Sequence, residues 1–308
     1  MFVPAIKIQR LSKSFKHIPA VDGLNLTVPA GEIFGFLGPN GAGKSTTLRM
    51  LLTLIRPTSG SIDIFGLPLH AHRKEALANI GSIIEKPDFY LYLTGTQNLW
   101  LLAKLHGLTD AGTRITRLLD LVGLAGRGNH LVKTYSHGMK QRLGIAQALL
   151  HDPKLIILDE PTTGLDPQGI IELRYLLLKL KNEQGKTIVL SSHILPEVEL
   201  IADSMVIMHQ GKAVAQGKVA NLLSSEKLIV KVETDNPLAA KIALQETALG
   251  HQLTADDPAS ISLTLSRKDI PELIHLLTDK SIAVFGISYQ RPLEEYFLKI
   301  TQNTVSYA

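Results

Sequence analysis

The stretch GPNGAGKST, residues 38–46, decides the fold. It satisfies the pattern G-x-x-x-x-G-K-[ST], follows the apolar run EIFGFL at 32–37 and opens a helical stretch that begins near Gly43. A strand, a glycine-rich turn and a helix in this order cradle phosphate, because backbone N–H groups and the helix N-terminus point at the anion. Chance produces the pattern in about one chain in a hundred of this size. A purely structural glycine turn is therefore the weaker interpretation.

Each residue type in this loop has a chemical task. Gly41 and Gly43 let the backbone curl around phosphate oxygens, Lys44 reaches the β- and γ-phosphates, and the Ser45 hydroxyl can bind Mg²⁺. The predicted nucleotide-binding residues of the loop are Gly38, Pro39, Asn40, Gly41, Ala42, Gly43, Lys44, Ser45 and Thr46. The loop predicts a nucleoside triphosphate site with a magnesium ion.

An acidic pair follows a second apolar run. In LIILDEP, residues 155–161, four apolar residues precede Asp159 and Glu160. A buried strand would carry Asp159 to the sheet edge, where it can hold Mg²⁺ directly or through water. Glu160 can then act as general base on a water aligned with the γ-phosphate. Acidic pairs are common at strand ends, so this motif indicates a hydrolase only in combination with the phosphate loop.

Apolar β-like runs alternate with amphipathic helical stretches over the first 220 or so residues, which favours an α/β fold. We expect residues 1–222 to form this domain, with a helical insertion at about 86–150 that opens with a capping box at Thr94 and Gln97. Residues 223–308 suggest a small α+β accessory domain. The expected strands are 5–11, 24–28, 32–37, 61–66, 80–84, 155–160, 187–192, 228–234, 260–265 and 282–288. The expected C-terminal helices are 237–248, 269–279 and one from about Pro292.

Composition excludes several other classes of protein. The 308 residues are 45% hydrophobic and 19% charged, as in a globular protein of about two domains. Cysteine is absent, which excludes disulfides, cysteine–zinc sites and thiol nucleophiles. The start lacks a signal-peptide pattern and no apolar run reaches membrane-spanning length, so we expect a soluble, cytoplasmic protein. The net charge of +4 comes without an arginine-rich tract, so we expect no nucleic-acid partner.

The segment YSHGMKQRLGIAQAL, residues 135–149, resembles the signature motif L-S-G-G-Q of ABC-transporter ATPases. Ser136 and Gly138 match that motif, whereas the residues at 135, 137 and 139 depart from it. Three other features of the family occur in the order that the family has. Phe15 matches the aromatic residue that stacks on adenine. The GLDP at 164–167, with Asp166, resembles the D-loop, and His193 resembles the switch histidine. The resemblance covers about residues 5–220.

This resemblance implies a P-loop NTPase fold of ABC type that binds ATP and Mg²⁺. It implies that Glu160 and His193 are catalytic, that Phe15, Ser136, Gly138 and Asp166 contact nucleotide, and that Ser45, Glu85 and Asp159 lie at the metal. Two copies would pair head to tail with each ATP at their interface. A separate membrane-spanning permease would hold the subunit at the inner face of the cell membrane.

Glu85 stands in GSIIEKPDFY, residues 81–90, where most members of that family have a glutamine that touches Mg²⁺ and the attacking water. The glutamate resembles the branch that handles bacitracin and lantibiotics. It implies an ATPase subunit of an exporter for an antimicrobial peptide or drug. The alternative is a solvated loop acid with no ligand.

Two other functions are open at this point. One is a non-transport ABC ATPase that acts on ribosomes or DNA, although the chain has neither a second ATPase unit nor long heptad arms. The other is a GTPase, since the phosphate loop does not select the base; an N-K-x-D guanine motif is absent from the sequence.

Overall fold

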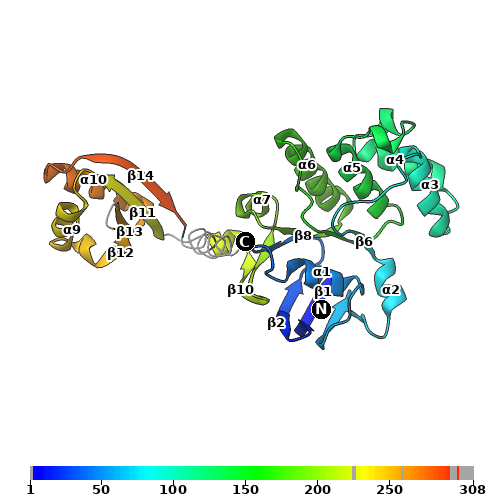
Figure 1. Cartoon of the computed structure of the whole chain (residues 1–308), viewed down its shortest axis with the longest axis horizontal. Helices are drawn as coiled ribbons and strands as arrows, with labels where there is room; N and C mark the ends of the chain where they lie inside the picture. Colours follow the sequence, from blue (N-terminus) through cyan, green and yellow to red (C-terminus); the bar gives the residue numbers. More distant parts are fainter. Residues whose placement is uncertain (1–2, 224–226, 258–259, 292–296, 298–308) are drawn as a thin grey trace. The chain divides into compact units, whose positions relative to one another are not determined.

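The computed structural model describes residues 3–223, 227–257, 260–291 and 297. The chain divides into two compact units, residues 1–219 and 220–308, close to the boundary predicted at 222. Figure 1 shows the helices and strands of both units, coloured by their position in the sequence. The helix predicted from Pro292 lies outside the described residues except for Phe297.

The central sheet of the first unit has six strands in the order β10-β9-β3-β8-β7-β6. Five of them are parallel and β10 runs antiparallel to β9. The strands β3, β7 and β8 are buried at every residue, as expected for apolar runs covered on both faces. The strands are β3 (Ile33–Leu37), β6 (Ile80–Ile83), β7 (Leu155–Leu158), β8 (Thr187–Ser192), β9 (Ser204–His209) and β10 (Lys212–Lys218).

A second sheet of the first unit is antiparallel, in the order β2-β1-β4-β5. Its strands are β1 (Ile6–Phe15), β2 (Ile18–Val28), β4 (Ser59–Ile64) and β5 (Leu67–Pro68). The predicted strand at 24–28 is only the second half of β2. The first half was missed because its residues are mostly exposed and carry no apolar alternation.

Helices cover the sheets and form the predicted insertion. Between β6 and β7 lie three of them, and the first begins with the predicted capping box: Thr94 Oγ1 accepts from Gln97 N at 3.1 Å, and Gln97 Oε1 accepts from Thr94 N at 2.9 Å. This prediction is confirmed. The helices are α1 (Lys44–Leu51), α2 (Arg73–Ala78), α3 (Gly95–Leu105), α4 (Ala111–Leu121), α5 (His137–Ala148), α6 (Pro167–Gln184), α7 (Leu195–Glu199) and α8 (Val219–Leu223), the last of which includes the boundary between the units.

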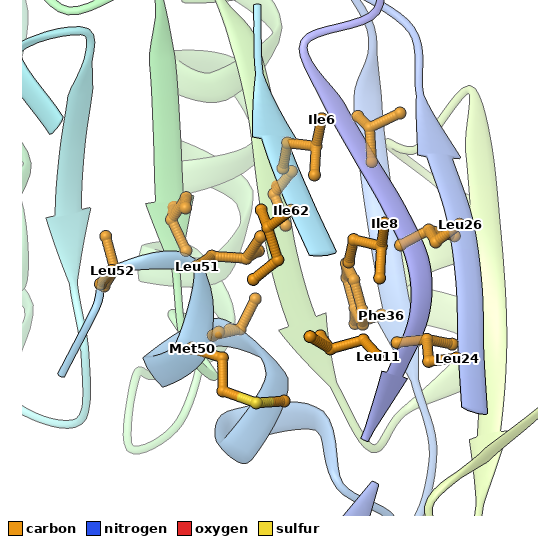
Figure 2. Packing of buried hydrophobic residues seen from close by; sticks show 14 of the residues in the cluster. Ile6, Ile8, Leu11, Leu24, Leu26, Phe36, Met50, Leu51, Leu52 and Ile62 are labelled. Carbon is orange, nitrogen blue, oxygen red and sulfur yellow. The ribbon is translucent and has the colours of Figure 1, made fainter. Parts of the chain in front are cut away.

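One hydrophobic core joins the two sheets of the first unit through α1. Figure 2 shows Ile8 and Leu11 of β1 facing Phe36 of β3, with Met50 and Leu51 of α1 beside them. Phe36 and Leu51 are fully buried. The core therefore fixes α1 against the strand that precedes it, which sets the shape of the loop between them.

The described residues of the second unit include an antiparallel sheet in the order β12-β13-β11-β14 and the helices α9 and α10. Its core lies between them and includes Val230, Leu263 and Leu273. The edge strand β12 was not predicted, because LTADD has no apolar alternation. The elements are β11 (Lys227–Thr234), α9 (Pro237–Gln245), β12 (Leu253–Asp257), β13 (Ser260–Ser266), α10 (Ile270–Asp279) and β14 (Val284–Gln290).

Two histidines stack where the insertion meets the central sheet. The rings of His106, at the end of α3, and His151, after α5, are 4.7 Å apart and nearly parallel. His151 Nε2 lies 3.0 Å from the Ile80 carbonyl oxygen. Burial lowers the pKa of His151, and the neighbouring His106 lowers it further.

This lowered pKa predicts a loss of stability in acid. A group whose folded pKa lies below its unfolded value of 6.5 favours folding above that pH, and this contribution is lost as pH falls through the folded pKa. We expect the free energy of unfolding to fall between pH 7.5 and 5.5, and to fall less in His151→Asn. His17→Asn, at an exposed site, is the control. Equal acid slopes in all three proteins, measured by urea denaturation, would contradict this role.

Candidate active site

The phosphate loop connects the buried strand β3 to α1. Lys44 is the first residue of that helix and is only 5% exposed; its Nζ donates to the carbonyl oxygens of Gly38 at 2.6 Å and Pro39 at 3.3 Å. Gly43 has φ +100°, and a Cβ there would lie 2.5 Å from the Ala20 carbonyl oxygen. Only glycine fits this position, because both the backbone conformation and the close approach exclude a side chain.

Asp159 directly follows β7 and is 5% exposed. Its Oδ1 accepts from Ser45 Oγ at 3.1 Å and from Ser191 Oγ at 2.6 Å. The parallel pairing of β7 with β8 carries Asp159 and Ser191 to the same sheet edge. The structure thus brings together Ser45 and Asp159, residues 114 apart in the sequence.

Glu160 bridges two cationic or potentially cationic side chains. Its Oε1 lies 3.3 Å from Lys44 Nζ, and its Oε2 lies 2.8 Å from His193 Nδ1. Glu160 has φ +48°, a backbone conformation that non-glycine residues rarely adopt. Its backbone N–H donates to Ser191 Oγ at 2.8 Å, which stabilises this turn. The predicted residues Lys44, Glu160 and His193 therefore meet in one network.

Two members of this network were missed in the sequence. Ser191 is fully buried and connects the Asp159 carboxylate to the Glu160 backbone. Glu197 on α7 accepts from Thr162 Oγ1 at 2.8 Å and from Ser192 Oγ at 3.1 Å, and so joins the segment after Glu160 to the end of β8. The available signal was the pair of serines that ends the apolar run TIVLSS.

A second cleft of about 350 Å³ gathers three other predicted nucleotide contacts. It is lined by Ser136, Gly138 and Asp166, together with Gly164 and neighbouring residues, and by no residue of 38–46. Ser136 caps α5 by accepting from Met139 N at 3.2 Å, and Asp166 caps α6 by accepting from Gly169 N at 3.1 Å. Two helix N-termini with partial positive charge therefore line one cleft.

His137 connects the walls of this cleft. Its Nε2 lies 3.1 Å from the Thr163 carbonyl oxygen. The ring also lies against Gly164, where a Cβ would come within 3.1 Å of Nε2. The imidazole thus fastens the start of α5 to the turn that precedes α6.

Phe15 ends β1 and is 49% exposed, so it is not a core residue; Lys13 Nζ lies 5.1 Å from its ring centroid. The β1–β2 hairpin that carries it approaches the phosphate loop at Ala20 and Gly43. A role for Phe15 in stacking on adenine stays a prediction.

Glu85 follows β6 and forms an ion pair with Arg49 of α1. The Glu85 side chain is 69% exposed, and among the described residues it forms no hydrogen bond with Ser45 or Asp159. The pair still links the segment after β6 to the helix of the phosphate loop. A place for Glu85 at the metal stays a prediction.

The described residues contain no cluster of three or more His, Cys, Asp or Glu side chains suited to a metal ion. Ser45 Oγ and Asp159 Oδ1 are two oxygen donors side by side, and Mg²⁺ prefers few protein oxygens together with phosphate oxygens and water. The donor set therefore fits Mg²⁺ in combination with a bound triphosphate.

Every helix in the described ranges is too short or too polar to span a bilayer.

The chain is similar to a known protein family and to several known proteins. The family model ABC transporter matches residues 21–163. The bacitracin transport ATP-binding protein BcrA of Bacillus licheniformis is 41% identical over 96% of each chain. The lantibiotic transport ATP-binding protein SrtF of Streptococcus pyogenes is 44% identical over 68% of this chain and 90% of its own. A dimeric ATP-binding cassette in a post-hydrolysis state, bound to ADP and Pi, is 28% identical with a TM-score of 0.63, over 70% of this chain and 98% of its own. The predicted fold class is confirmed.

Ser191 offers a test of the network. We expect Ser191→Ala to lower the free energy of unfolding by about 1–3 kcal/mol, because the Glu160 N–H and the Asp159 carboxylate lose a buried partner. ATP turnover should fall about tenfold or more, because the Asp159 carboxylate and the backbone turn at Glu160 lose their orientation. Urea denaturation and steady-state ATPase assays measure the two effects. The control is Ser288→Ala at an exposed position; if Ser191→Ala matches it in both assays, Ser191 does not hold the site.

Proposed function

The chain belongs to the ABC transporter family of ATP-binding proteins, and we propose that it hydrolyses ATP to power an exporter for an antimicrobial peptide of the bacitracin or lantibiotic class. The observation that carries this proposal is the similarity to BcrA along nearly the whole of both chains. The relatives favour transport over the alternative role on ribosomes or DNA.

Lys44 is the phosphate-binding cation of the proposed mechanism. Its Nζ is held by two loop carbonyl oxygens and by Glu160, so the ammonium group is already buried where the loop can present it to phosphate. A triphosphate in the loop would exchange part of these contacts for its own β- and γ-oxygens. The backbone N–H groups of the loop and the N-terminus of α1 add to this attraction.

Glu160 is the proposed general base and His193 its positioning residue. The His193 Nδ1–H donates to one carboxylate oxygen of Glu160 and fixes the orientation of the carboxylate. The other carboxylate oxygen lies 3.3 Å from Lys44 Nζ. In this role Glu160 takes a proton from the water that attacks the γ-phosphate.

Ser45 and Asp159 would hold Mg²⁺ in the same site. When bound, that ion neutralises charge on the β- and γ-phosphate oxygens. Ser191 keeps Asp159 directed toward Ser45 through its 2.6 Å hydrogen bond.

A second copy of the chain is proposed to complete the site. The cleft at Ser136 and Gly138 contains no residue of the phosphate loop, so these two parts are separate within one chain. Pairing of two copies would bring the cleft of one against the nucleotide of the other, and a solved relative is dimeric. A membrane permease, as in other transporters of this family, would anchor the pair at the inner face of the membrane.

Glu160→Gln tests this function. An amide cannot accept the proton, so we expect ATP turnover to fall about 10²–10⁴-fold while ATP binding persists. Placed at the native locus, the variant should remove protection against bacitracin or a lantibiotic, measured as the peptide concentration that stops growth.

The control for this experiment is Glu183→Gln, an exposed residue in the last turn of α6 with no role in the site. It should leave both turnover and protection unchanged. If Glu160→Gln retains normal turnover, Glu160 is not the base. If turnover is lost but growth in the peptides is unchanged, the proposed substrate class is wrong.

Glu85 provides a separate prediction. A carboxylate binds Mg²⁺ more strongly than an amide oxygen, so Glu85→Gln should raise the Mg²⁺ concentration needed for half-maximal hydrolysis, by several-fold, if Glu85 lies at the metal during turnover. ATP binding without metal should hardly change. Arg49→Gln separates the effect of the ion pair from that of metal binding. Superimposable Mg²⁺ titrations of the wild type and Glu85→Gln would leave Glu85 as a solvated acid.

A further inference from the structure

A cleft of about 690 Å³ lies at the C-terminal end of α1, whereas the phosphate loop lies at the N-terminal end of the same helix. Its walls are the end of α1, the segment that leads into β4, and the residues around the start of α2. The volume falls within the range of about 300–1,000 Å³ that is typical of small-molecule sites. None of the residues assigned above to nucleotide or metal lines it.

The floor of the cleft is apolar. Met50, Ile62 and Leu69 line it and are at most 5% exposed. Figure 2 shows Met50 on α1 and Ile62 on β4 within the cluster of buried side chains. These residues are fixed by the core of the first unit, so the floor is preformed.

The rim of the cleft is cationic. Arg56 and Arg73 line it together with His70, and no lining residue is Asp or Glu. Within the described part of the chain, neither arginine forms an ion pair with a carboxylate. The acidic residue of α2, Glu75, instead lies 3.2 Å from His72 Nδ1 and does not line the cleft.

One of the two guanidinium groups is oriented by the protein. Arg73 Nε donates to Thr53 Oγ1 at 2.7 Å, just beyond the end of α1. This hydrogen bond uses Nε and leaves the two terminal nitrogens of Arg73 to a ligand. An arginine fork pairs with two oxygens of a phosphate or carboxylate, and it does so best when it is already oriented.

We propose that this cleft binds a small amphipathic anion, a phosphate monoester with an apolar body. The phosphate would pair with Arg73 and Arg56, and the apolar body would cover Met50, Ile62 and Leu69. The two arginines without a carboxylate partner favour a negatively charged ligand, and the buried apolar floor favours a ligand with an apolar body. Ligand binding in this cleft is independent of the transported substrate and of the catalytic role of Glu160.

Octyl phosphate is the probe, because it has both parts and is soluble. Isothermal titration uses the full-length protein with saturating ADP, so that the phosphate loop is filled. We expect one molecule of octyl phosphate to bind per chain, while inorganic phosphate and octyl glucoside, each with only one of the two parts, bind at least about tenfold more weakly.

Charge-neutral variants locate the binding site. Arg73→Gln and Arg56→Gln should each raise the dissociation constant of octyl phosphate about tenfold, because each removes a charge-assisted contact. Lys74→Gln is the matched control, since Lys74 neighbours Arg73 on α2, is exposed and does not line the cleft. Both arginines are exposed, so the substitutions leave the core intact.

A sedimentation assay with vesicles distinguishes a lipid headgroup from a soluble phosphate monoester as the ligand. Binding to phosphatidic acid vesicles that Arg73→Gln abolishes indicates a lipid headgroup, and octyl phosphate binding without vesicle binding indicates a soluble monoester. The proposal is overturned if octyl phosphate does not bind with ADP present, or if both arginine variants bind it as the wild type does.

Discussion

The pairing of a buried lysine with a strained glutamate is the contact on which the rest of the site depends. Lys44 is almost fully buried at the start of α1, where a cation is costly without partners. Glu160 supplies the opposite charge from the end of β7, and the loop carbonyl oxygens satisfy the remaining hydrogens. The pair connects two parts of the chain that are far apart in sequence, so the phosphate loop and the acidic edge of the sheet form one unit.

The parallel sheet makes this pairing possible. The ends of β3, β7 and β8 lie at one edge, which places the phosphate loop, the carboxylates of Asp159 and Glu160, and the hydroxyl of Ser191 together. The Ser191 hydroxyl then contacts both acidic residues: it donates to the carboxylate of Asp159 and accepts from the backbone N–H of Glu160. The helical insertion carries Ser136 and Gly138 to a different cleft. The fold thus divides the predicted nucleotide contacts into two sets on one chain.

Part of the fold and of the candidate site could be predicted from the sequence, because the chemistry there requires residues that are close together in the chain. The phosphate loop and the Asp159–Glu160 pair are local patterns, and the capping box at Thr94 is set by residues three apart. Ser191 was missed because its partners reach it through strand pairing rather than sequence proximity. The Arg49–Glu85 ion pair was missed because the fold, and not sequence proximity, brings α1 next to the segment after β6. The first half of β2 and the edge strand β12 lack apolar alternation, so no periodic signal marked them.

Each ATP site is proposed to be shared between two copies of the chain, and mixing two inactive variants tests this sharing most directly. Lys44→Ala removes the proposed phosphate-binding cation, and Gly138→Asp adds a negative charge to the second cleft at a position where a Cβ is only in ordinary contact with Leu165. A heterodimer has one site with both defects and one with neither. We predict that an equimolar mixture recovers about a quarter of wild-type ATP hydrolysis, as random pairing in a twofold dimer requires. A mixture as inactive as either variant alone would contradict the shared site.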